Sequence, residues 1–129
     1  MDQNNKSGTG GMVERQGSDD GAAVLVYATF PAHQAAEDAG RALIAARLAA
    51  CVNILPSMTS IYRWDGKIER ADEVVLIAKL PPHLADQAVA MIVAGHAYET
   101  PAVLVIPVAS GAARYLDWIR AETLPAKLA

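Results

Sequence analysis

The sequence has 129 residues, a formal net charge of −3 and 53% hydrophobic residues, which is the size and composition of a single domain with one packed core. Because no segment gathers Lys and Arg with aromatic residues, the charge pattern excludes a nucleic-acid partner. The single cysteine excludes an internal disulfide and a cysteine-rich zinc site, and it favours a reducing compartment. No apolar run has membrane-spanning length and no signal-like segment opens the chain, so we expect a cytoplasmic protein without a membrane partner.

Residues 1–21 are rich in Asn, Gln, Gly, Ser and Asp and contain few apolar side chains. Such a composition cannot bury enough surface to offset the entropy lost on ordering, so the sequence predicts a disordered N-terminal tail followed by one domain over 22–129. The domain opens with the nearly continuous apolar run 22–30, which is typical of a central strand and ends at Pro31.

An Ala-rich stretch from residue 32 to residue 50 has the spacing of an amphipathic helix. Ala39, Leu43, Ala46 and Ala50 recur at steps of four, three and four, which places them on one face. We expect this face to pack on a sheet.

A long hairpin follows the helix. Residues 51–64 are rich in β-branched and aromatic side chains, and Asp65-Gly66 is the dipeptide that a type I′ turn requires. The return strand occupies 67–80. Pro56 lacks an N–H group and therefore marks a bulge or an edge position in the first of the two strands.

Two further helices and one strand complete the chain. Pro82 suits the first position of a helix that Gly95 can end, and a loop then leads into the strand 102–108. Ser110 is positioned to cap the last helix.

The order is therefore β-α-β-β-α-β with a C-terminal helix. This pattern predicts an α+β fold, the ferredoxin-like split βαβ sandwich, in which an antiparallel sheet carries both helices on one face. The other face would be bare and apolar, and the hairpin arms are longer than one small sheet needs. We expect this face to be buried against other subunits in a cyclic oligomer.

Four spaced motifs resemble those of the CutA divalent-cation-tolerance proteins, and the resemblance extends over residues 22–122. They are Arg47-Leu48-Ala49-Ala50-Cys51-Val52-Asn53, Thr59 to Glu69, His96-Ala97-Tyr98-Glu99-Thr100-Pro101 and Tyr115-Leu116-Asp117-Trp118. The resemblance implies a homotrimer with clefts between subunits and a role in tolerance of divalent metal ions, copper above all, with no established reaction. The chain departs from the family at Ala97, where proline is common, and it lacks the extra cysteines that some members carry.

His96, Glu99 and Cys51 are the candidate metal ligands. An imidazole and a carboxylate three residues apart suit copper or another borderline divalent cation, and a neighbouring subunit could complete the coordination sphere. A hydrogen-bonded structural role for His96 is an equal alternative. Cys51 lies between apolar residues at a helix-to-strand junction, so inert packing is favoured over ligation.

Five further residues are expected at subunit interfaces or in the clefts between subunits. Aromatic side chains on long hairpins commonly anchor oligomers, and Lys67 can lie on a solvated face or line a cleft. These residues are Tyr62, Trp64, Lys67, Tyr98 and Trp118.

No motif for nucleophilic catalysis, nucleotide phosphates or a metalloprotease is present, so the sequence does not predict an enzyme. The alternative function is that of a trimeric signalling or adaptor protein, similar to the PII proteins, that binds a small molecule or a protein. The two-residue turn Asp65-Gly66 argues against this alternative, because PII proteins have a long loop at the corresponding place.

Overall fold

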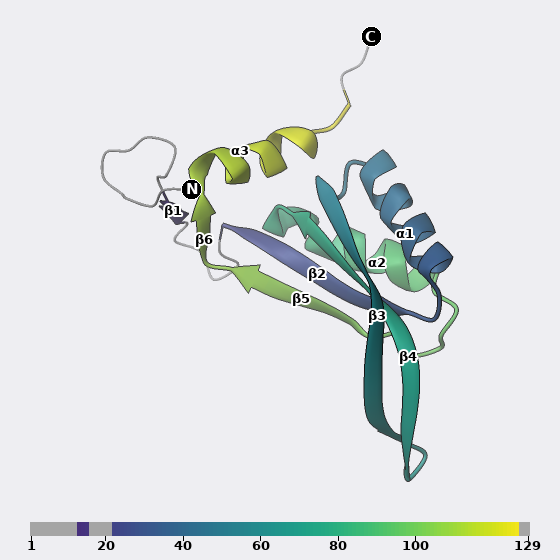
Figure 1. Cartoon of the computed structure of the whole chain (residues 1–129). Coiled ribbons are helices and arrows are strands. Elements are labelled where there is room, and N and C mark those ends of the chain that lie inside the picture. The colour runs from purple at the N-terminus through teal and green to yellow at the C-terminus, as the bar shows by residue number, and fades with distance from the viewer. Residues whose placement is uncertain (1–12, 16–21, 127–129) are drawn as a thin grey trace.

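A computed structural model describes residues 13–15 and 22–126 and shows the predicted order of elements with three short additions. Figure 1 shows the long hairpin extending beyond the rest of the sheet. The elements are β1 (Val13–Arg15), β2 (Ala23–Phe30), α1 (His33–Ala45), β3 (Cys51–Trp64), β4 (Lys67–Leu80), η1 (Pro82–Leu84), α2 (Ala85–Ala94), β5 (Val103–Val108), β6 (Ser110–Ala112) and α3 (Ala113–Glu122).

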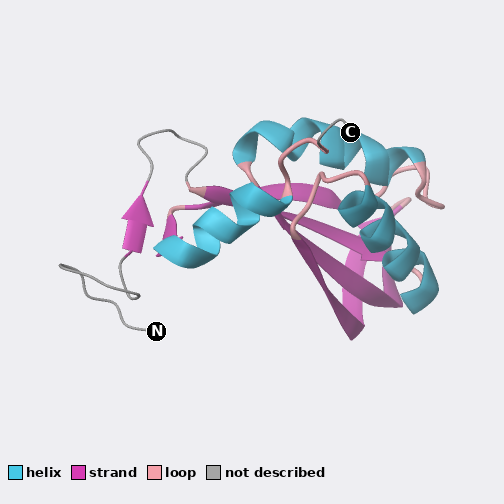
Figure 2. Ribbon diagram, turned by 90° about the horizontal axis from the view of Figure 1, so that it is seen from above, coloured by secondary structure: helices cyan, strands magenta, loops and turns pink. Residues whose placement is uncertain are grey.

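The main sheet has four antiparallel strands in the order β3-β4-β2-β5, which confirms the predicted ferredoxin-like α+β fold. Because β4 lies between β2 and β3, the first βαβ unit is split, as the sequence pattern indicated. Helices α1 and α2 cover one face of this sheet, as Figure 2 shows from above. No helix in the described part of the chain is long and apolar enough to cross a membrane.

The core lies between this face and the two helices. Alternate residues of the central strands point toward the helices and are almost completely buried, among them Val26, Ala28 and Leu76. They meet Leu43 of α1 and Ile92 of α2. Full burial of a Val, Leu or Ile side chain stabilises the fold by roughly 1.5–3 kcal/mol.

Helix α1 ends at Ala45, so the predicted helix from 32 to 50 was five residues too long. Arg47 adopts a left-handed φ of 60°, and the N–H of Leu48 donates to the oxygen of Leu43 at 2.9 Å. This is the hydrogen bond of a Schellman turn, which stops a helix and here turns Leu48 into the core. Ala46 consequently lies exposed outside the helix.

Strand β3 carries the irregularity that Pro56 predicted. Leu55 lies opposite Val75, but Met58 lies opposite Glu73, so β3 contains one residue more than β4 between these two pairs. Strand β3 is also an edge strand of the sheet. Pro56 therefore lies both at a bulge and on an edge strand, the two positions that tolerate a proline.

The region around the last helix differs from the prediction. Ser110 does not cap α3; it begins β6, which pairs with β1, and the residue at the helix N-cap is Ala112. The predicted tail contained no strand, whereas Val13–Arg15 forms one. The remaining residues of the predicted tail, 1–12 and 16–21, lie outside the described residues.

The sheet face opposite the helices is apolar at several exposed positions. Leu104 and Ile106 of β5 and Leu55 of β3 are each more than two-fifths exposed. Exposed apolar residues on an uncovered sheet face are typical of a protein contact.

Candidate functional site

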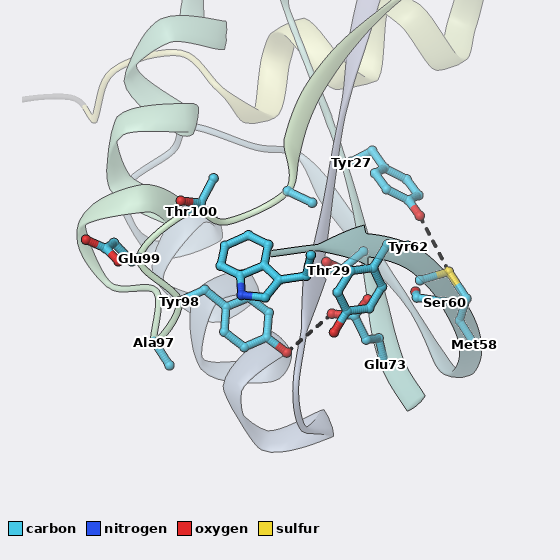
Figure 3. Close-up of a pocket in the computed structure, with 12 residues that line it drawn as sticks. Tyr27, Thr29, Met58, Ser60, Tyr62, Glu73, Ala97, Tyr98, Glu99 and Thr100 are labelled. Carbon is cyan, nitrogen blue, oxygen red and sulfur yellow. Dashed lines mark hydrogen bonds between the residues drawn. The ribbon is translucent and has the colours of Figure 1, made fainter. Parts of the chain in front are cut away.

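A cavity of about 660 Å³ lies on the uncovered side of the sheet, where the hairpin arm meets the end of β2 and the loop that follows α2. The close-up in Figure 3 shows side chains from these three segments around the cavity, with Tyr98 of the loop pointing toward Glu73 of the hairpin. The cavity is lined by Tyr27, Thr29, Met58, Ser60, Tyr62, Trp64, Glu73, Ala97, Tyr98, Glu99, Thr100 and Ala102.

The bulge in β3 decides which side chains of the arm reach this cavity. Residues opposite each other in an antiparallel pair share a face, and side chains alternate between faces along a strand. With Met58 opposite Glu73, the residues that line the cavity are Met58, Ser60, Tyr62 and Trp64. Without the extra residue, Ser57 would lie opposite Glu73 and the two aromatic side chains would turn to the other face.

Tyr98 and Glu73 join the loop to the hairpin. The phenol oxygen of Tyr98 donates to Oε2 of Glu73 at 3.3 Å, drawn as a dashed line in Figure 3. Burial raises the pKa of Tyr98 above its usual 10.0, and the nearby Glu73 carboxylate and Tyr62 raise this pKa further. Each cause disfavours a phenolate, so Tyr98 is a neutral hydrogen-bond donor at this site.

His96 is held from both ring nitrogens. Its Nε2 lies 2.7 Å from the backbone oxygen of Thr29, and its Nδ1 accepts the N–H of Tyr98 at 3.0 Å. A carbonyl oxygen can only accept and an N–H can only donate, so these partners select the neutral imidazole with its proton on Nε2. The ring also stacks on Phe30, with 4.6 Å between centroids.

These contacts favour the structural role of His96 over the role of metal ligand. A metal ion needs a nitrogen lone pair, and the only one of the neutral ring accepts the Tyr98 N–H. Cys51 is half-buried rather than fully buried. It lies opposite Lys79 of β4, whereas Thr29, which contacts His96, lies opposite Val75, four residues away on the same strand. That offset is about 13 Å at the rise of a strand, so Cys51 does not join His96.

The described part of the chain gathers no group of three or more His, Cys, Asp or Glu side chains that could hold a metal ion. Glu99 is exposed at the edge of the cavity, and Figure 3 shows its carboxylate pointing away from Glu73. The three predicted ligands therefore do not form a site within one chain.

The predicted interface residues separate into two groups. Tyr62, Trp64 and Tyr98 line the cavity together. Lys67 is exposed opposite Trp64 and does not line the cavity. Trp118 lies on α3, where it stacks on Tyr115 with 5.6 Å between centroids.

Sequence reasoning missed eight of the residues that line the cavity, of which Ala97, Thr100 and Ala102 lie between α2 and β5. The alternation from Met58 to Trp64 was the one available signal for two of them, because it would have assigned Met58 and Ser60 to the face of Tyr62. Tyr27, Thr29 and Glu73 come from strands distant in sequence, and only the sheet register brings them here.

The charges of the lining favour a cationic occupant. Among the described residues, Glu73 and Glu99 are the charged side chains that line it, and no Lys, Arg or His does so. Carboxylates in a partly apolar surround attract positive charge more strongly than they do in water.

Comparison with known proteins identifies relatives across most of the chain. The family described as CutA1 divalent ion tolerance protein matches residues 24–122. The divalent-cation tolerance protein CutA of Thermus thermophilus is 39% identical over 99 residues, which cover 77% of this chain and 96% of that protein. The chloroplastic CutA protein of Arabidopsis thaliana is 34% identical over 78% of this chain, which spans only 55% of that longer protein.

The solved structures agree. The structure described as the periplasmic divalent cation tolerance protein CutA of Archaeoglobus fulgidus superposes with a TM-score of 0.77 at 34% identity, covering 79% of this chain and 99% of the other. Because the relatives are described as chloroplastic in one case and periplasmic in another, cytoplasmic location stays a prediction.

Proposed function

We propose, from the premise that this chain belongs to the CutA1 divalent ion tolerance family, that it limits the harm of excess divalent cations as a homotrimer and that copper is its principal ion. The observation that supports cation binding is the cavity whose charged lining residues are both carboxylates. Copper(II) is a borderline ion that accepts carboxylate and imidazole ligands, whereas copper(I) prefers the sulfur ligands that are scarce here.

The trimer is supported by the exposed apolar sheet face and by the aromatic hairpin arm. Trp64 is 60% exposed in the single chain and Leu104 is 61% exposed, which is costly unless another subunit covers them. Sedimentation at micromolar protein concentration tests this assembly, and a monomer would overturn it. Trp64→Ala should weaken the trimer and make the midpoint of thermal unfolding more dependent on concentration.

Metal binding by such a trimer would use groups from more than one subunit, since the described residues of one chain do not assemble three ligands. Of the predicted ligands, Glu99 is the one that needs no rearrangement, because its side chain is exposed at the cavity edge. His96 would first have to give up its bond from Tyr98.

Calorimetry with copper(II) tests this proposal on the wild type and on the variants Glu99→Gln and His96→Ala. We expect Glu99→Gln to weaken binding at least tenfold and Glu122→Gln, an exposed carboxylate at the end of α3, to leave it unchanged. If His96→Ala abolishes binding while Glu99→Gln does not, the assignment of ligands is wrong. Failure of the wild type to bind any divalent cation would overturn metal binding itself.

The second candidate function is that of a non-catalytic signalling or adaptor trimer that binds a small molecule or a protein. The aromatic character of the cavity favours it, because Tyr27, Tyr62, Trp64 and Tyr98 offer ring surface that a metal ion does not use. We also propose that the protein has no enzymatic activity of its own. We further propose that it acts in the cytoplasm, and cell fractionation checks this location.

A further inference from the structure

We propose that the cavity between the hairpin arm and the loop after α2 binds a small organic cation, such as a quaternary or protonated amine, with Glu73 as its counter-ion and aromatic rings as its walls. This inference goes beyond metal tolerance, since it names a different class of ligand and does not require that a metal ion binds.

The first support is the aromatic content of the lining. Four of the twelve lining residues carry phenol or indole rings, and they come from β2, the hairpin arm and the loop. The faces of such rings attract cations, and enclosures of several aromatic rings are the usual binding sites for quaternary ammonium groups. They are Tyr27, Tyr62, Trp64 and Tyr98.

The second support is the position of a carboxylate among these rings. Glu73 is half-buried, and its Oε2 accepts the hydroxyl of Tyr98. Tyr62 and Tyr98 line the same cavity as this carboxylate. In the part of the chain that the structure describes, no cationic side chain lines the cavity to neutralise Glu73, so a bound cation would supply the missing charge.

The third support is size. The cavity volume of about 660 Å³ is within the range of roughly 300–1,000 Å³ that is usual for small-molecule sites. A bare metal ion would fill little of this space and needs several close donor atoms. Figure 3 shows the carboxylate of Glu73 turned toward Tyr98 and that of Glu99 pointing away from Glu73, so the two do not converge on one point. An organic cation uses the ring surface as well as the charge.

Binding is measured on the full-length protein in its native assembly, with a chelator present so that metal binding cannot contribute. Choline is the probe, and 3,3-dimethyl-1-butanol, a neutral molecule of almost the same shape, is its control. Calorimetry, with tryptophan fluorescence as a second readout, gives both affinities. We expect choline to bind at least about tenfold more tightly than the neutral alcohol, because only the charged group gains from the rings and from Glu73.

Variants separate the contribution of charge from that of the rings. Glu73→Gln keeps the size of the side chain and should weaken choline binding about tenfold, while Glu122→Gln should leave it unchanged. Tyr98→Phe keeps the ring and should change choline binding by less than about threefold, whereas Tyr98→Leu should weaken it by about tenfold. Circular dichroism and sedimentation check that each variant keeps its fold and assembly.

Three results would overturn the proposal. They are the absence of saturable choline binding by the wild type, equal affinity for choline and the neutral alcohol, and unchanged choline affinity in a folded Glu73→Gln variant. None of these results bears on copper binding, which is measured separately without chelator.

Discussion

The imidazole Nε2 of His96 lies 2.7 Å from the backbone oxygen of Thr29, 67 residues earlier in the chain. This bond fastens the loop after α2 to the end of β2, and the Nδ1 of the same ring fixes the backbone of Tyr98. The loop residue Tyr98 is thereby held where its hydroxyl reaches Glu73. His96 therefore positions one wall of the cavity.

His96→Ala should destabilise the protein by about 1–3 kcal/mol, because two hydrogen bonds are lost and the buried residue Thr29 loses a partner for its carbonyl. Urea unfolding at one fixed protein concentration measures this change. His83→Ala, in which the replaced ring is exposed in η1, is the matched control and should stay within about 0.5 kcal/mol of the wild type. Equal stabilities of the two variants would contradict the structural role.

The raised pKa of Tyr98 predicts a loss of stability at alkaline pH. The unfolded chain releases the Tyr98 proton near its usual pKa of 10.0, whereas the folded chain holds it to higher pH. Stability from this group is therefore complete below about pH 10 and falls as the pH rises through the folded pKa. Tyr98→Phe should show a smaller loss of stability above pH 10 than the wild type.

Spectrophotometric titration of the phenols checks the cause. Burial and the adjacent Glu73 carboxylate both raise the pKa of Tyr98. Glu73→Gln removes this negative charge, so the phenol of Tyr98 should titrate at lower pH in the variant than in the wild type. An unchanged titration would mean that Glu73 does not act on Tyr98.

Gly40 marks the closest approach of α1 to the sheet. A Cβ atom at this position would lie 2.8 Å from Cγ2 of Val52, a stiff β-branched side chain. Overpacking costs about 1–3 kcal/mol, while alanine in a helix gains about 1 kcal/mol over glycine, so Gly40→Ala should destabilise by up to about 2 kcal/mol. In a Val52→Ala background the same change should instead stabilise, which a double-mutant cycle measures.

Arg47 holds a left-handed conformation that suits glycine. This conformation destabilises a residue with a side chain by about 1–2 kcal/mol. Glycine avoids this strain, but its greater freedom in the unfolded chain offsets part of the gain. Arg47→Gly should therefore stabilise the protein by about 0.5–1 kcal/mol. Arg47→Ala removes the same guanidinium, including its 3.4 Å bond to the oxygen of Leu124, and keeps the strain, so it should not stabilise.

Local sequence determined the elements that depend on local chemistry. The turn is one case, since Asp65 and Gly66 have φ values of 53° and 79°, as their residue types require. The apolar runs, the position of Pro56 and the four motifs predicted the strands, the bulge and the family in the same way. Each of these signals acts over a few neighbouring residues.

Tertiary structure decided where α1 ends and what His96 does. The Ala-rich pattern continues past Ala45, and the burial of Leu48 through the left-handed turn at Arg47 ends the helix instead. The partners of His96 include Thr29, whose distance along the chain no pattern of spacing encodes.

The cavity also depends on tertiary structure, because its walls come from three separate segments. A shift of one residue in the register of β3 would turn Tyr62 and Trp64 to the other face, and the local sequence tolerates either orientation. The choice is made by the pairing of whole strands around the buried core, where the energy of packing exceeds that of local preference.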